Sequence, residues 1–390
     1  MITTINNKHN KLNVPNLRFP EFQGEWKKKK LEECVEFLDG LRKPIKSEDR
    51  KSEQGLYPYY GASGIIDYID GYIFDGEYIL LSEDGANIID RNYRVAFIAK
   101  GKIWVNNHAH VLQPYDGFDI NFLSETLERL NYAVYNTGTT MPKLNQEVCR
   151  NINLKIPTTE EQNKIGNLLS LLNKRIATQN KIIDKLQSLI KGINQRVFMN
   201  NGINYKLGEV CEIRSGYSGN QLLSKKGLKV SRIETISGHK VNLERVGYVA
   251  SFESSENYKL QVGDILFSNI NSVEYIGNTA FIDKDYDLYH GMNLLRLIPN
   301  NMVVIPFYLY LLLNTNRMLN RFKTVCNKAV SQASINQTEL GKTVVQIPDI
   351  NAQKQICELY QALYDKLESE KYANSLFQKQ KQYLLRQMFI

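Results

Sequence analysis

The sequence predicts an α+β protein in which two similar globular domains are separated by a long antiparallel two-helix coiled coil, as a pseudo-twofold internal repeat. The repeat is the first observation, because residues recur at a constant separation of 191 positions without a gap. The repeated pairs are Asn145/Asn336, Gln146/Gln337, Ile156/Ile347, Pro157/Pro348, Gln162/Gln353, Ile165/Ile356 and Phe198/Phe389. Repetition over this length indicates one structural unit used twice.

The second observation is a coiled-coil period in the segments 158–200 and 349–390, which we predict to be long helices. Thr158 and Glu161 directly after Pro157 are typical of a helix start with a capping box. Apolar residues then recur at alternating spacings of four and three, the period of a coiled-coil seam. The seam residues expected at the helix–helix interface are Ile165, Leu169, Leu172, Ile176, Ile183, Leu186, Ile190, Leu363, Leu367, Phe377 and Leu384.

Burying the two seams on each other is the economical way to remove this apolar surface from water. Helices that leave equivalent domains must then run antiparallel. Four polar seam positions should restrict their register, namely Gln179, Glu370, Asn374 and Lys381. Such helices are about 60 Å long at 1.5 Å per residue, and we expect them to act as a spacer between the domains.

The third observation is a mixture of buried strand patterns and glycine-rich turns in the segments 17–157 and 201–348, the predicted globular domains. Apolar runs at 77–82 and 94–98 read as strands, and 122–135 has helical spacing. The first sixteen residues are polar and rich in asparagine, and we expect them to be frayed. Core patterns recur between the two domains at drifting separations, so the scaffold is shared while the loops differ in length.

Composition limits the function classes. The net charge is +8 and the pI about 9.0, which hints at an acidic partner such as nucleic acid. Five widely spaced cysteines without a CxxC pair fit free thiols in the cytoplasm. No run of 18 apolar residues occurs, so no membrane span is expected, and the polar start lacks the apolar region of a secretory signal.

Motifs for catalysis are missing from the sequence. There is no P-loop and no GxGxxG fingerprint after a strand. His108 and His110 could ligate a metal, but satisfied strand histidines are the better interpretation. Glu83-Asp84 beside Gly85 reads as a turn. Together with the spacer architecture, this favours a binding protein. The alternatives are a coiled-coil adaptor that does not bind DNA and, less favoured, a nuclease.

Several motifs resemble those of specificity subunits of type I restriction–modification systems, the HsdS family. The resemblance spans essentially the whole chain. The second domain departs from it at 331–336, and it lacks a clear counterpart of the Tyr-Gly-Ala-Ser-Gly block. The motifs are Leu17-Arg18-Phe19-Pro20-Glu21-Phe22, Tyr59-Tyr60-Gly61-Ala62-Ser63-Gly64, Glu83-Asp84-Gly85, Thr137-Gly138-Thr139-Thr140-Met141-Pro142-Lys143-Leu144-Asn145 and Ile156-Pro157 with Glu160-Glu161-Gln162.

The resemblance implies a non-catalytic subunit with two target recognition domains, each reading one half of a split, asymmetric sequence in double-stranded DNA. It implies two modification (methyltransferase) subunits docked on the helices and, for restriction, translocase–nuclease subunits. This chain would need no cofactor of its own, whereas the partners would use S-adenosylmethionine for adenine N6 methylation, ATP and Mg²⁺.

Base readout needs side-chain donors and acceptors on loops, and phosphate contact needs cations or small donors. For each nominated residue the alternative is an ordinary solvated loop position. In the first domain we nominate Lys43, Tyr60, Ser63, His108 and Lys143. In the second domain we nominate Arg214, Arg232, Asn269, Asn271 and Gln332.

Overall fold

The computed structural model describes residues 3–4, 13–50, 55–198, 202–328 and 332–390. The chain forms two compact units. Unit 1 comprises Met1–Lys181 and Lys371–Ile390, and unit 2 comprises Ile182–Glu370. Each unit therefore contains one predicted globular domain together with a part of each long helix, α4 (Thr159–Val197) and α9 (Ile350–Gln387).

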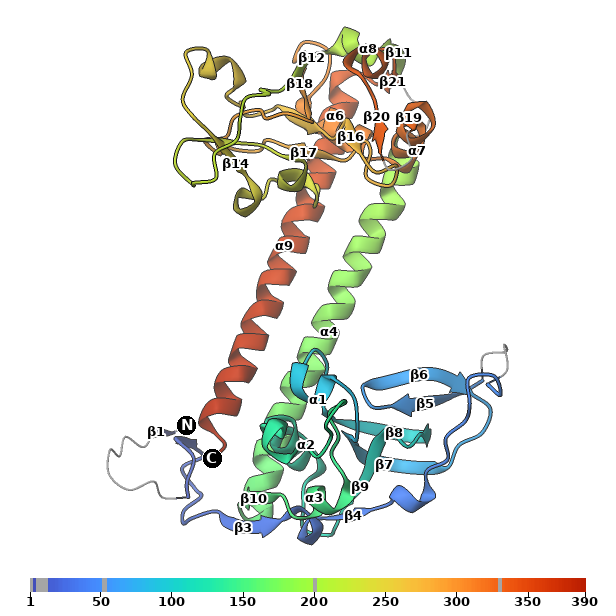
Figure 1. Cartoon of the computed structure of the whole chain (residues 1–390), viewed down its shortest axis with the longest axis vertical. Helices are drawn as coiled ribbons and strands as arrows, with labels where there is room; N and C mark the ends of the chain where they lie inside the picture. Colours follow the sequence, from blue (N-terminus) through green and yellow to red (C-terminus); the bar gives the residue numbers. More distant parts are fainter. Residues whose placement is uncertain (1–2, 5–12, 51–54, 199–201, 329–331) are drawn as a thin grey trace. The chain divides into compact units, whose positions relative to one another are not determined.

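Unit 1 is built on a six-stranded sheet of order β4-β9-β7-β8-β5-β6. All of its pairings are antiparallel except β5 with β8. Helix α2 (Ile120–Glu128) packs against β7 and β8 (Figure 1). The strands are β4 (Val35–Phe37), β5 (Tyr57–Gly61), β6 (Gly64–Ile69), β7 (Phe74–Ser82), β8 (Ala96–Val105) and β9 (Ala109–Pro114). The strand predicted at 77–82 is confirmed, and the one predicted at 94–98 begins two residues later.

The helix predicted over 122–135 is wrong in its length. The Asp119 carboxylate caps α2 by accepting from the Phe122 amide at 2.7 Å, and α2 ends at Glu128. A separate 3-10 turn follows over Tyr132–Tyr135, because the Asn131 side chain accepts from the Ala133 amide at 3.1 Å. Local side-chain capping thus interrupts a continuous helical pattern.

Unit 2 repeats the plan on a smaller sheet of order β12-β18-β15-β17. These strands are β12 (Cys211–Ser215), β15 (Ile265–Phe267), β17 (Thr279–Phe281) and β18 (Leu295–Pro299). A three-stranded sheet lies beside it, of β16 (Ile270–Asn271), β19 (Asn327–Lys328) and β20 (Ala333–Ser334). Further elements are β13 (Leu228–Val230), β14 (Gly247–Val249), α5 (Leu207–Val210), α6 (Pro306–Leu313), α7 (Asn316–Val325) and α8 (Gln337–Gly341).

Each unit also contains a two-stranded ladder at the matching place in the repeat. In unit 1, β3 (Lys27–Lys30) pairs with β10 (Asn153–Ile156), and α3 (Gln146–Arg150) precedes β10. In unit 2, β11 (Ile203–Lys206) pairs with β21 (Val344–Ile347), with Ile203 opposite Ile347 as Lys27 is opposite Ile156. The ladders confirm the repeat inferred from the sequence.

The predicted seam residues are all members of apolar clusters. In unit 1 the α4 residues Ile165, Leu169, Leu172 and Ile176 share a core with the α9 residues Phe377 and Leu384. In unit 2 the α4 residues Ile183, Leu186 and Ile190 share a cluster with the α9 residues Leu363 and Leu367. The helices run antiparallel within unit 1, because Asn180 lies 2.8 Å from Asn374 while Arg175 stacks over Phe377.

We expected the two seams to be buried only against each other, but they also pack against the globular domain. Ile165 and Leu169 share the unit 1 core with domain residues such as Phe122. Lys381, predicted to restrict the helix register, instead contacts Glu125 of α2 at 3.1 Å. The reason is that the core of the globular domain extends to the helix pair and offers it apolar surface and the buried Glu125 carboxylate.

Two further expectations need correction at the N-terminal end of unit 1. The capping box is incomplete, because the Glu161 side chain binds Arg18 at 2.7 Å instead of returning to Thr158. Within the segment expected to be frayed, Asn13 accepts a 2.7 Å hydrogen bond from the Trp26 amide and Pro15 is buried. Residues 1–2 and 5–12 lie outside the described part of the chain.

Candidate nucleic-acid interface

One end of the unit 1 sheet gathers the loops that carry the nominated residues. The Glu83 amide donates to the His108 carbonyl at 2.9 Å, and the Glu83 carbonyl accepts from the Leu144 amide at 2.7 Å. The segment around Lys143 therefore lies beside the turn before β9. On the other side, the Ser82 hydroxyl donates to the Ala62 carbonyl at 2.5 Å, at the β5–β6 turn that holds Ser63.

Tyr60 and Lys43 belong to the same end. The Tyr60 carbonyl accepts from the Asn106 amide at 3.0 Å, and the Lys43 carbonyl accepts from the Trp104 indole at 2.6 Å. The Lys43 and Ser63 side chains are exposed, whereas the Tyr60 ring is half-buried against Phe97. Burial raises the pKa of the Tyr60 hydroxyl, so this group acts as a neutral donor.

Carboxylates lie beside the nominated His108 and Lys143 in this loop cluster, which the sequence interpretation did not anticipate. The His108 ring lies 2.9 Å from the Asp84 carboxylate, and the Lys143 ammonium lies 3.5 Å from Glu83. Both nominated side chains are about half exposed. The two carboxylates are less exposed, Asp84 at 25% and Glu83 at 14%, and Glu83 is also bound by Arg42, so they hold these two side chains in place at the surface.

A buried network fixes these loops from beneath. His110 lies in β9 and contacts the Asp39 carboxylate at 2.7 Å and the Leu144 carbonyl at 2.8 Å. Arg42 binds Glu83 at 2.7 Å and the Ala109 carbonyl at 2.8 Å. His110 is thus the satisfied strand histidine that the sequence predicted, whereas His108 lies in the turn before the strand. In the described ranges no cluster of His, Cys, Asp and Glu forms a metal site.

The His110–Asp39 contact shifts both pKa values in directions that favour an ion pair. Burial alone lowers the pKa of His110, but its contacts with Asp39 and Cys149 outweigh burial and raise the pKa to about 10. Burial tends to raise the pKa of Asp39, but the hydrogen bond from His110 and its charge hold that pKa below the ordinary value.

We expect the contribution of His110 to stability to depend on pH. Its pKa is raised above the ordinary value of about 6.5, so the stabilisation is fully present below about pH 6.5 and is lost as the pH rises through 10. The difference in unfolding free energy between the wild type and His110→Gln should therefore shrink from pH 6 to pH 10 in urea titrations.

His290 of unit 2 supplies the matched control. Burial lowers the pKa of this histidine to about 4, so it stays neutral over the same pH range. The effect of His290→Gln should grow slightly from pH 6 to about pH 7.5, as the histidine of the unfolded chain loses its proton, and then stay constant to pH 10, where the effect of His110→Gln should keep shrinking. A constant effect of His110→Gln would show that the His110–Asp39 contact is not ionic.

The corresponding end of the unit 2 sheet holds a second loop cluster. There Ser215, Leu295 and Phe267 stand side by side on β12, β18 and β15. Asn269 follows β15. Asn271 on β16 is paired with Ala333 on β20, and the exposed Gln332 directly precedes Ala333. The structure therefore brings Asn269, Asn271 and Gln332 together.

One amide of this cluster, that of Asn269, is incompletely used, whereas the Asn271 oxygen accepts from the Ser272 amide at 2.8 Å. Asn269 donates a long 3.4 Å hydrogen bond to the Ile335 carbonyl, and its side-chain oxygen is buried without a partner among the described residues. Asn271 donates to the Ser268 hydroxyl at 3.1 Å. Arg214 is exposed on β12 but is paired with Glu212 at 2.7 Å, so it is less available than the sequence suggested.

Arg232 lies at a hollow of about 320 Å³ beside the same sheet end. Its guanidinium is 3.5 Å from Glu234, and the exposed pair leaves donors free. Three amide side chains at this hollow were missed by sequence reasoning, although the stretch Ser218–Gln221 is a polar loop of the right kind. The lining residues are Ser218, Gly219, Asn220, Gln221, Arg232, Ile233, Glu234, Met292 and Asn293.

The two loop clusters share one backbone frame. The Leu144 amide donates to the Glu83 carbonyl in unit 1, and the Ile335 amide donates to the Asn269 carbonyl at 2.9 Å in unit 2. Both donors precede a helix capped by an asparagine of the repeat, Asn145 and Asn336. A carboxylate in one unit thus corresponds to an amide in the other, so the same frame contains different hydrogen-bonding groups in the two units.

Comparison with known proteins places this architecture in a family. Two segments, residues 23–188 and 202–375, match the type I restriction modification DNA specificity domain. No helix in the described ranges is long and apolar enough to cross a membrane.

Individual relatives agree with the family match. A Methanocaldococcus jannaschii protein assigned as the MjaX type I restriction enzyme specificity subunit is 42% identical over 158 residues, 40% of this chain and 37% of the relative. The MjaVIII specificity subunit of the same organism is 24% identical over 95% of this chain and 92% of its own length. The S subunit structure from M. genitalium has the same fold, with a TM-score of 0.68 at 16% identity over 97% of this chain and 99% of that one. The chain therefore belongs to the type I restriction–modification specificity subunits, and it is a DNA-recognition subunit of such a system.

Proposed function

We propose that this subunit reads a split, asymmetric target in double-stranded DNA, one half with each loop cluster. The observation that carries the proposal is the shared backbone frame with different side chains, Glu83 in unit 1 and Asn269 in unit 2. Beside these frames unit 1 exposes Lys143 and unit 2 exposes Gln332. A lysine binds guanine O6 and N7, whereas an amide binds adenine N6 and N7. Equivalent frames with unlike groups favour unlike half-sites over a palindrome.

The reaction belongs to partner subunits, because a specificity subunit supplies recognition to a type I complex. We propose two modification subunits that use S-adenosylmethionine and, for restriction, translocase–nuclease subunits that use ATP and Mg²⁺. The internal repeat supports one docking position in each unit, since both units contain the same ladder between the ends of the long helices.

The test is methylome sequencing of a methylation-free host that expresses this chain with its cognate modification subunit. We expect a split, asymmetric methylated motif that disappears without this chain. The double variant Asn269→Ala with Asn271→Ala should relax only one half of that motif, since each lost base contact costs about 1–3 kcal/mol of discrimination.

A methylation pattern that ignores this chain would overturn the proposal and favour a protein adaptor. Salt dependence separates these functions, because phosphate contacts make DNA affinity fall steeply as salt rises. Magnesium-dependent cleavage by the purified chain alone would instead support a nuclease.

The helix pair should set the length of the unread gap between the half-sites. Seven residues inserted after Asn180 in α4 and before Asn374 in α9 preserve the heptad phase at the point where these side chains meet. The seam lengthens by about 10 Å. At about 3.4 Å per base pair, the methylated motif should gain roughly three base pairs in its gap.

The control for this prediction is the same insertion in α4 alone, which mismatches the helices and should abolish methylation. A gap of unchanged length in the double insertion would mean that the helices do not determine the spacing.

A further inference from the structure

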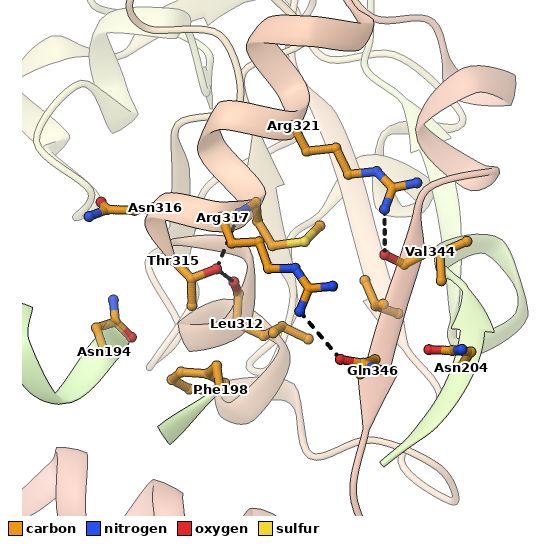
Figure 2. Close-up of a pocket in the computed structure, with 12 residues that line it drawn as sticks. Asn194, Phe198, Asn204, Leu312, Thr315, Asn316, Arg317, Arg321, Val344 and Gln346 are labelled. Atoms are coloured by element: carbon orange, nitrogen blue, oxygen red, sulfur yellow. Dashed lines mark hydrogen bonds between the residues drawn. The ribbon is translucent and has the colours of Figure 1, made fainter. Parts of the chain in front are cut away.

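A pocket of about 340 Å³ in unit 2 lies away from the residues nominated for DNA contact. It is formed by the end of α4, the β11–β21 ladder and the first turns of α7 (Figure 2). Its lining combines apolar side chains with a few polar and charged ones, as is usual in ligand-binding pockets. The lining residues are Asn194, Phe198, Asn204, Leu312, Thr315, Asn316, Arg317, Met318, Arg321, Val344, Val345 and Gln346.

Two arginines give the pocket its charge. Figure 2 shows Arg317 and Arg321 projecting from α7 toward β21. Arg317 donates to the Gln346 side-chain oxygen and Arg321 to the Val344 carbonyl, each at 3.4 Å, the long limit of a hydrogen bond. Both side chains are exposed, and no carboxylate occurs among the lining residues. Guanidinium groups have five donors, so most of theirs remain available to an anion.

The matching surface of unit 1 is covered by the chain itself. Gln346 corresponds in the repeat to Lys155, whose ammonium donates to the Asn13 side-chain oxygen. Phe198 corresponds to Phe389, whose ring lies 6.2 Å from that of the buried Trp26. The segment from Asn13 to Trp26 thus lies over positions whose counterparts in unit 2 line the pocket.

A segment with the chemistry of the one that covers unit 1 would not be complementary to the pocket in unit 2. In unit 1 the Arg18 of this segment is held by the buried Glu161. The counterpart of Glu161 in unit 2 is Ala352, which cannot pair with an arginine. Unit 2 instead offers two guanidinium groups in a pocket that is also lined by Phe198 and Met318. A complementary occupant brings a carboxylate next to an apolar side chain. A DNA phosphate would bind the guanidinium groups but would leave the apolar lining residues without a partner.

We propose that this pocket docks a polypeptide segment of the modification subunit that carries a carboxylate beside an aromatic or aliphatic side chain. Arg317 and Arg321 bind the carboxylate, which Arg can do in a bidentate geometry. Phe198, Leu312 and Met318 contact the apolar side chain. The proposal rests on the proposed function, since it requires a modification subunit as partner.

The experiment uses a double variant that carries both Arg317→Ala and Arg321→Ala. It is compared with a control variant that removes two positive charges elsewhere in unit 2. The control is Lys323→Ala with Lys342→Ala, because neither lysine lines the pocket. Calorimetric titration with the purified modification subunit should show affinity at least about tenfold weaker for the arginine variant and nearly unchanged for the control. Arg317→Lys with Arg321→Lys keeps the charges and should recover part of the affinity.

DNA binding by the chain alone separates the possible outcomes. The arginine variant should bind the target duplex as the wild type does and melt at the same temperature. Unchanged assembly with the modification subunit would overturn the proposal. The proposal would also be overturned if the arginine variant assembles normally but binds DNA more weakly and with a smaller dependence of affinity on salt concentration. That result would identify the pocket as a phosphate-binding site. A wild-type chain that neither binds DNA nor assembles would refute the proposed function itself.

Discussion

Replacing Glu161 by alanine should destabilise unit 1 by about 3–5 kcal/mol, because the change leaves a buried guanidinium without its counter-ion. Arg18 and Glu161 form a two-point contact at 2.7 and 2.8 Å, and the side chains are 6% and 0% exposed. Arg18 also donates to the Gly24 carbonyl at 2.6 Å, so it holds the chain segment before Trp26 against the start of α4. Urea unfolding followed by a probe confined to unit 1 measures the effect.

The double variant Arg18→Met with Glu161→Leu is the control. Removing both charges and keeping the volume should restore most of the lost stability, since an apolar pair avoids the desolvation of two ions. Unit 2 has Ala352 at the position equivalent to Glu161, and its stability should not change in either variant. Equal losses in the single and double variants would show that packing, and not charge pairing, is what Glu161 provides.

Replacing Phe389 by alanine, as a separate variant, should lower the unfolding free energy of unit 1 by about 3–5 kcal/mol, the usual loss for a buried aromatic side chain. The Phe389 ring is 4% exposed, stacks on Phe122 at 5.3 Å and meets Trp26 edge to face at 6.2 Å. Arg129 lies over the same ring at 5.2 Å. Hydrogen exchange measured by mass spectrometry should show loss of protection in the core of unit 1, with unit 2 unaffected.

The internal repeat supplies the matched variant, Phe198→Ala in unit 2. Phe198 contacts Tyr308 and Tyr360 at 5.4 and 6.1 Å, but it is only half-buried at the edge of the pocket. Its replacement should therefore cost less than that of Phe389, and the loss of protection should fall in unit 2. Loss of protection spread over both units would contradict their independence.

Features that follow a repeating spacing along the chain could be predicted from the sequence. Contacts between residues that are far apart in the chain could not. The spacing of Ile165, Leu169 and Leu172 reports one helix face, so the seam was visible in the chain alone. The partner of Lys381 is Glu125, 256 positions earlier, and no local pattern encodes such a pair. His110 and Asp39 are similarly brought together only by the pairing of β4 with β9.

The candidate interface divides in the same way. Asn269, Asn271 and Gln332 were nominated because base readout needs side-chain donors and acceptors, and the structure brings them together. Asn220 and Asn293 were missed because they come from separate loops that meet only at the hollow beside Arg232. Glu83 and Asp84 were taken for a simple turn, since their contacts with Arg42 and His108 depend on the folded sheet.

The discontinuity of unit 1 has a consequence for synthesis on the ribosome. Its first segment ends at Lys181, but its core also needs the last twenty residues, Lys371–Ile390, which emerge after all of unit 2. Unit 2 is a continuous segment, so it can complete its core before unit 1 can. The half of the chain made first is thus finished last, and until then the surface reserved for Phe389 stays open to water and to chaperones.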